Sequence, residues 1–188
     1  VISSATKTTE PDVEDIRYPT EYSRFRTSLE SALSIWKSTM AAQPEAGNWI
    51  HNSKTLRDWM INSQEQVLCI TGPPGSGKSM VAESLYNELS KPDKTFGFRR
   101  RICIHLVFKM EEKAKHNKSM VISALVIQLL DQNQSLQQLA IRKIGLRRRG
   151  SQPIPPHVLQ GLLNTLLEGV SETPIYFIVD AIDECDAD

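Results

Sequence analysis

One eight-residue run constrains the fold of this chain more than any other part: residues 72–79 read GPPGSGKS. The run matches the pattern G-x-x-x-x-G-K-[S/T], in which a glycine-rich loop joins a strand to a helix and binds phosphate groups. The apolar run VLCI at residues 67–70 predicts the strand, and apolar residues at helical spacing predict a helix over residues 78–90. This context favours a phosphate site over an ordinary glycine-rich turn, and it indicates an α/β fold.

Each position of this loop has a physical role in that interpretation. Glycines let successive backbone N–H groups face phosphate oxygens, and the following helix adds the positive end of its dipole. Lys78 is expected to reach the β- and γ-phosphates, and the Ser79 hydroxyl to bind Mg²⁺. The candidate nucleotide-binding residues are Gly72, Pro73, Pro74, Gly75, Ser76, Gly77, Lys78, Ser79 and Met80.

A second group of candidate site residues follows the apolar run IYFIV at residues 175–179. This run predicts a buried strand, and Asp180 stands at its carboxyl end, where parallel α/β sheets bind ligands. Asp180 is therefore a candidate Mg²⁺ ligand together with Ser79. Asp183 and Glu184 are both candidates for the group that activates water, and Glu184 is slightly favoured. The alternative is an acidic cluster that only ends a strand and solvates a loop.

The rest of the chain divides into three parts. Residues 1–21 are rich in Ser, Thr and acidic residues and predict a disordered tail or linker. Residues 22–62 predict a helical N-terminal extension that begins with an amphipathic helix over 22–41, whose partner is either the domain or another protein. Residues 63–188 predict the phosphate-binding domain, with a further strand at 102–108 and helices at 119–130, 134–144 and 156–169, the first capped by Ser119.

Strands that alternate with helices predict a three-layer α/β fold around a parallel sheet of about three strands. Trp49 and Trp59 are expected in the core, with contact to an adenine as the alternative. Cys69, Cys103 and Cys185 have no C-x-x-C spacing and are expected to be reduced, and the four histidines lack the spacing of a zinc site.

Composition limits the partners that can be expected. Twenty-two basic residues balance 22 acidic ones, so no overall charge attracts nucleic acid or an anionic membrane. The arginine clusters at 99–101 and 147–149 contain no interleaved aromatic residues and are interpreted as solvated loops. No apolar run approaches the length of a membrane-spanning helix, and no secretory pattern opens the chain. We therefore expect a cytoplasmic protein that binds neither membrane nor nucleic acid.

Four segments together resemble NACHT domains, which belong to the STAND class of signal-transducing P-loop NTPases. They are GNWIHNSKTLRDW, GPPGSGKS after VLCIT, VISALVIQLLDQ and IYFIVDAIDEC, so the resemblance spans about residues 47–186. The acidic segment is the most specific of them. In NACHT terms GPPGSGKS is the Walker A motif and the acidic segment is the Walker B motif. The upstream segment is similar to fungal members, which often carry ankyrin or WD40 repeats.

The resemblance implies a switch controlled by ATP and ADP with Mg²⁺. Such proteins rest with ADP, exchange it for ATP, self-associate through the NTPase core and signal through an attached effector, as in fungal innate-immunity-like signal transduction. The family core continues beyond the acidic motif into further strands and a phosphate sensor. We therefore expect weak or absent hydrolysis in this chain and a nucleoside-triphosphatase only in a complete protein.

Two alternatives to the ATP switch are a non-catalytic scaffold acting through its N-terminal helix and a small-molecule kinase using the same loop. ATP is preferred over GTP because no N-K-x-D motif is present.

Overall fold

The computed structural model describes residues 22–30, 47–61, 67–91, 101–109, 117–144 and 154–184. Residues 22–30 form a helix. The elements that follow in chain order are η1 (Asn48–Asn52), α2 (Lys54–Ile61), α3 (Lys78–Leu89), β1 (Ile102–Val107), α4 (Lys118–Gln132), α5 (Gln134–Ile144), α6 (Pro156–Glu168), β2 (Ile175–Asp180) and η3 (Ile182–Glu184).

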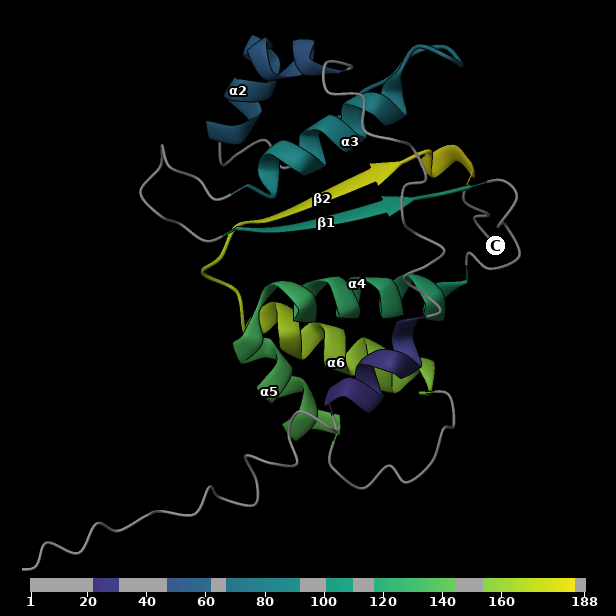
Figure 1. Ribbon diagram of the computed structural model, residues 1–188, viewed down its shortest axis with the longest axis vertical. Helices are drawn as coiled ribbons and strands as arrows, with labels where there is room; N and C mark the ends of the chain where they lie inside the picture. The colour runs from purple at the N-terminus through teal and green to yellow at the C-terminus, as the bar shows by residue number, and fades with distance from the viewer. Residues whose placement is uncertain are drawn as a thin grey trace, which may run out of the picture.

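These elements form three layers around a small parallel sheet (Figure 1). Strands β1 and β2 pair in parallel, with a register that runs from Ile102 opposite Ile175 to Val107 opposite Asp180. Helix α3 lies on one face of the sheet, with η1 and α2 beyond it, and α4, α5 and α6 lie on the other face (Figure 1). The fold is therefore a helix-rich α/β arrangement, as the alternation of apolar runs predicts.

The expectation of about three strands is not met in the part of the chain that the structure describes. Residues 67–70 lie outside the sheet, because no ladder hydrogen bond joins them to β1 or β2. Their side chains still alternate: Leu68 and Ile70 pack against the core under α3, whereas Val67 and Cys69 are exposed. The segment therefore has the side-chain pattern of a strand but no hydrogen-bonded neighbour. Cys69 was expected to lie in a strand, and it does not.

Two apolar clusters hold the layers together. The larger one lies between the sheet and α4, α5 and α6, where Ile104, Leu130 and Leu166 are completely buried. The smaller one joins η1 and α2 to α3 through Ile50, Leu56, Val81 and Leu85. Strand β1 is therefore covered on both faces, which explains why it is apolar along almost its whole length.

The outer edge of β1 is closed by two glutamine side chains from α4. The Gln132 amide accepts a hydrogen bond from the Cys103 N–H at 2.9 Å and donates one to the Cys103 carbonyl at 2.7 Å. Gln128 forms the same pair with His105, at 2.9 and 3.1 Å. Gln128 and Gln132 are one helical turn apart and Cys103 and His105 are two residues apart, so the amides take the place of a neighbouring strand.

Strand β2 is less buried than its apolar sequence predicts. Phe177 is 50% exposed and Val179 is 42% exposed. The register places both on the face that carries Ile104 and Leu106, which point into the core of α4 and α6. The prediction of a buried strand was wrong for these two residues. Among the described residues no strand pairs with the edge of β2 that faces away from β1, and little covers Phe177 and Val179.

The N-terminal ends of α4 and α6 follow from local chemistry, but the residue that caps α4 differs from the predicted one. Helix α4 is capped by Asn117, whose side chain accepts a hydrogen bond from the Met120 N–H at 3.1 Å, and Ser119 lies inside the helix instead. Helix α6 begins at Pro156, a position where the missing N–H costs no hydrogen bond. Sequence correctly predicts both helices but misplaces the first cap by two residues.

The helix at residues 22–30 belongs to the same core as the domain. Phe25 and Leu29 are buried in the larger cluster, and the helix lies beside α4 and α6 on the side away from the sheet (Figure 1). The expected helix over 22–41 is observed for residues 22–30, and its remainder lies outside the described residues. The partner surface that its amphipathic pattern requires is therefore this chain's own domain.

Candidate functional site

The glycine-rich loop, residues 72–79, depends on two glycines in the left-handed region of backbone conformation. Gly75 has a φ of 76° and Gly77 a φ of 85°, and a Cβ at either position would meet no atom within 4 Å. Glycine is therefore required at these positions by backbone conformation rather than by space. The Gly77 carbonyl accepts a hydrogen bond from the Val81 N–H at 3.0 Å, which starts α3 directly after the loop.

Lys78 bridges the beginning of its own loop. Its Nζ donates hydrogen bonds to the carbonyl oxygens of Gly72 at 2.8 Å and of Pro73 at 3.0 Å. The Ser76 N–H also donates to the Pro73 carbonyl, at 3.2 Å, so the loop is closed on itself. The ammonium is therefore held over the loop rather than extended into solvent.

The segment η1 supports the first turn of α3 from outside. A Cβ on Gly47 would lie 2.9 Å from the Met80 carbonyl oxygen and 3.1 Å from the Val81 Cα, and Gly47 has a φ of 84°. His51 Nε2 and Ser84 Oγ form a hydrogen bond of 2.8 Å further along α3. Sequence reasoning missed this support, although the glycine of GNWIHN was its visible signal.

The acidic residues lie at the end of β2. Asp180 is 8% exposed, and no described residue donates a hydrogen bond to its carboxylate. Ala181 has a φ of 54°, and the Glu184 N–H donates to the Ala181 carbonyl at 2.9 Å, which closes the turn η3. Glu184 is half-buried and Asp183 is exposed. A left-handed conformation is uncommon for any residue with a Cβ and is least tolerated by bulky or β-branched side chains.

The start of α3 and the carboxyl ends of β1 and β2 lie at the same end of the sheet (Figure 1). The glycine-rich loop and Asp180 are thereby placed at one edge of the molecule. Among the described residues no hydrogen bond or ion pair joins residues 72–79 to residues 180–184. The elements therefore bring the two halves of the site to one side of the molecule.

A buried polar pair next to this site was not found by sequence reasoning. His105 on β1 lies with its Nδ1 3.8 Å from Glu83 Oε2 on α3, and its ring stacks at a tilt on Tyr86 with centroids 5.1 Å apart. Burial lowers the pKa of His105, while the carboxylates of Glu83 and Asp180 act in the opposite direction. The neutral imidazole is therefore the favoured form in the folded protein.

Trp49 and Trp59 have different environments. Trp49 is 64% exposed on η1, so the expectation that it belongs to the core was wrong. Trp59 on α2 is half-buried and meets Tyr176 edge-on, with ring centroids 5.7 Å apart. The five-residue 3₁₀ segment η1 turns successive side chains to different sides, so Ile50 rather than Trp49 enters the core.

The remaining sequence predictions concern the cysteines, the arginine clusters, a metal site and a membrane-spanning helix. Cys103 is a free cysteine buried in β1, where burial raises the pKa of its thiol. Cys185 and the arginines at 99–100 and 147–149 lie outside the described residues. No three His, Cys, Asp or Glu side chains gather as a metal-binding group in the described ranges, and no helix in them is long and apolar enough to cross a membrane.

Fold and site together define a helix-rich α/β protein with a glycine-rich loop at the start of a helix and a carboxylate at the end of a parallel strand. The family model described as Nephrocystin 3, N-terminal, matches residues 45–188, and the chain belongs to that family. No curated protein and no solved structure matches the chain significantly. The family match includes the loop, η1 and the acidic residues, but it begins after the helix at residues 22–30.

Proposed function

We propose that this chain binds ATP and ADP on the glycine-rich loop and is the nucleotide-binding part of a switch of the NACHT type, with a P-loop NTPase fold. The observation that carries the proposal is the loop itself. Gly75 and Gly77 adopt left-handed conformations immediately before α3, and Lys78 is held over the loop by two of its carbonyls. This arrangement provides the backbone donors, the helix dipole and the cation that polyphosphates require.

Binding a polyphosphate in this loop would give Lys78 stronger partners than it has now. Its present acceptors are two neutral carbonyls, whereas phosphate oxygens are charged and accept stronger hydrogen bonds. Backbone N–H groups of residues 75 and 77–79 supply the remaining donors, because Pro73 and Pro74 have none and the Ser76 N–H donates to the Pro73 carbonyl. The loop would therefore hold the β- and γ-phosphates with little rearrangement.

Ser79 and Asp180 fit the chemistry of Mg²⁺, which prefers hydroxyl, carboxylate and phosphate oxygens. Ser79 is in the first turn of α3, and Asp180 is buried at the end of β2 without a described hydrogen-bond donor to its carboxylate. When bound, Mg²⁺ neutralises phosphate charge. Glu184, being half-buried, is the better candidate than the exposed Asp183 for holding a water against the phosphates.

The NACHT assignment rests on the segment IYFIVDAIDEC and on the left-handed Ala181 within it. A turn at this position allows two further acidic residues to follow the strand closely. We propose control of this switch by the exchange of ADP for ATP. The scaffold alternative has less support, because Phe25 and Leu29 of the N-terminal helix are packed in the chain's own core.

Thermal unfolding with and without nucleotide tests the proposal. Ligand at a hundred times its Kd stabilises a protein by about 2.7 kcal/mol, which raises the Tm of a chain of this size by roughly 5–10 °C. Mg·ATP and Mg·ADP should both produce such a shift, and Mg·GTP a smaller one. An unchanged Tm at millimolar Mg·ATP and Mg·ADP would refute nucleotide binding by this chain.

A further inference from the structure

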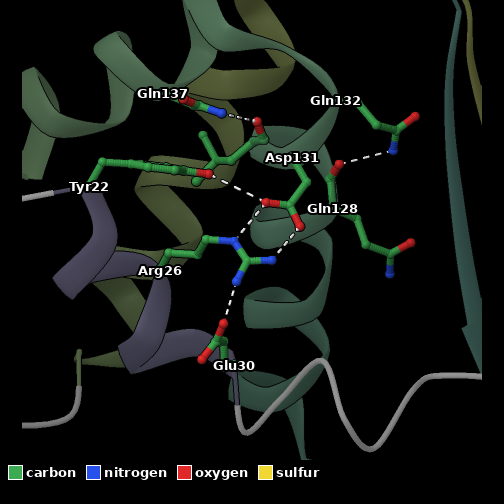
Figure 2. Close-up of polar contacts among 8 residues, drawn as sticks. Tyr22, Arg26, Glu30, Gln128, Asp131, Gln132 and Gln137 are labelled. Carbon is green, nitrogen blue, oxygen red and sulfur yellow. Dashed lines mark hydrogen bonds and ion pairs between the residues drawn. The ribbon is translucent and has the colours of Figure 1, made fainter. Parts of the chain in front are cut away.

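The helix at residues 22–30 is attached to α4 by a cluster of polar side chains (Figure 2). The Arg26 guanidinium donates two hydrogen bonds to the Asp131 carboxylate, each of 2.9 Å, and also contacts Glu30 on its own helix. Tyr22 donates a weaker hydrogen bond to Asp131 at 3.4 Å. Below this cluster Phe25 and Leu29 are buried in the main core. The contact thus has two apolar anchors and one bidentate ion pair.

The surface of α4 that receives this helix is fixed independently of it. Gln128 and Gln132, three residues and one residue from Asp131, hold an adjacent side of α4 to the backbone of β1 through four hydrogen bonds of 2.7–3.1 Å. Figure 2 shows these glutamines pointing away from Arg26 and toward the strand. Helix α4 also packs on α6. The backbone of α4 at Asp131 is therefore positioned by contacts that do not involve residues 22–30, whereas the Asp131 side chain contacts Tyr22 and Arg26.

The helix at residues 22–30 buries few side chains against the rest of the chain. Only Phe25 and Leu29 among its nine residues are buried, and the side chains of Arg26 and Asp131 remain 32% and 36% exposed. A helix of this length is unstable in isolation, so it must fold as it docks, and the ordering cost reduces the net attachment. An exposed ion pair adds little and is weakened by salt. The helix also precedes the segment that the family model matches.

We infer that the face of α4 around Asp131 is a binding site for an amphipathic helix and that residues 22–30 are a detachable cover on it. The partner it fits is a helix with two apolar residues four positions apart and an arginine directly after the first, the pattern of Phe25, Arg26 and Leu29. Release of residues 22–30 exposes the apolar site to such a helix from another polypeptide. The inference does not depend on nucleotide binding.

A labelled peptide of residues 20–34, added to full-length variants, tests this inference. Leu29→Asp removes an anchor of the resident helix and leaves the receiving surface unchanged, so this variant should bind the peptide at least tenfold more tightly than the unmodified chain. Thr27→Asp places the same charge on the exposed face of the helix and is the matched control. It should bind the peptide as weakly as the unmodified chain.

Charge reversal tests recognition by the ion pair. Adding Asp131→Arg to the Leu29→Asp chain should weaken binding of the peptide at least fivefold, and a peptide with Arg26→Asp should restore it. Equal peptide binding by the Leu29→Asp and unmodified chains would overturn the inference. So would loss of cooperative unfolding in the Leu29→Asp chain, because residues 22–30 would then be an essential part of the core, or an Asp131→Arg chain that binds both peptides equally.

Discussion

Three residues with positive φ define the backbone at the candidate site: Gly75, Gly77 and Ala181. The two glycines turn the loop toward its helix, and the alanine turns the chain after Asp180. Left-handed backbone is nearly free for glycine but costs other residues energy, and such positions persist where the surrounding structure requires them. At the scale of single residues, the site is therefore specified by conformation more than by contact.

Alanine substitution at these glycines separates the effect of backbone conformation on stability from the effect of side-chain packing. Gly77→Ala should destabilise the protein by about 1–2 kcal/mol because its φ is 85°, although its Cβ would meet no atom. Gly161→Ala is the control, because it also meets no atom but lies within helix α6, and it should stabilise by about 0.5–1 kcal/mol. Chemical denaturation measures both. Equal effects of the two substitutions would contradict the role given to backbone conformation.

Ala181 is predicted to respond in the opposite way to the loop glycines. Ala181→Gly should stabilise the protein by up to about 1 kcal/mol, because it relieves a residue at a φ of 54°. Ala181→Val should destabilise it by more than about 1 kcal/mol, because a β-branched residue fits this region poorly. Thermal denaturation of both variants measures the difference. If valine were tolerated as well as glycine, the turn after Asp180 would not have this conformation.

Acid should destabilise the protein through His105. Burial lowers its pKa in the folded state, so the unfolded chain takes up a proton first as the pH falls. The stability that the neutral imidazole contributes is therefore present at pH 7.5 and declines below about pH 6.5. Denaturation at pH 7.5, 6.5 and 5.5 should show this decline, and His105→Phe, which keeps a ring next to Tyr86, should reduce it. An identical pH profile for both proteins would exclude His105 as the cause.

At the scale of elements, the attachment of α4 to β1 is the least expected feature. Most helices cover a sheet with apolar side chains, whereas here Gln128 and Gln132 also pair with the strand's backbone. Unpaired strand edges invite association with other chains, and these amides close one edge without a further strand. Strand β1 is therefore bounded by β2 on one side and by α4 on the other.

Substitution of these glutamines should be costly. Gln132→Leu leaves the Cys103 N–H and carbonyl without partners, and a buried group left unsatisfied costs about 1–3 kcal/mol. Gln132→Glu keeps the acceptor but places a carboxylate oxygen against the Cys103 carbonyl, so it should also destabilise the protein. Gln138→Leu on the exposed side of α5 is the control and should change stability by less than about 0.5 kcal/mol. Equal stability of the Gln132→Leu and Gln138→Leu chains would contradict the pairing.

Sequence predicts most elements because their apolar spacing is unambiguous. Helices α3, α5 and α6 begin and end within a residue or two of their expected bounds. Residues 67–70 were misjudged because strand formation depends on a neighbour that sequence periodicity does not reveal. The left-handed loop glycines follow from their motif, whereas the Gly47 contact with Met80 and the His105–Glu83 pair arise from residues far apart in sequence.

At the scale of the whole molecule, the candidate site and the N-terminal helix occupy different layers. The glycine-rich loop begins α3 on one face of the sheet, and residues 22–30 lie beyond α4 on the other (Figure 1). The sheet that carries Asp180 stands between them, held to α4 by Gln128 and Gln132. The domain boundary expected at residue 62 does not divide the core, since Leu56 of α2 and Val81 of α3 share one cluster.

Titration calorimetry of Mg·ATP against the unmodified chain and two lysine variants tests the central claim most directly. Lys78 and Lys118 are each the first residue of a helix, but only Lys78 follows the glycine-rich loop. Lys78→Ala should weaken binding at least about tenfold, because a hydrogen bond to a charged group contributes about 1.5–3 kcal/mol, and Lys118→Ala should leave it unchanged. No saturable binding by the unmodified chain, or equal binding by the Lys78→Ala variant, would contradict nucleotide binding at this loop.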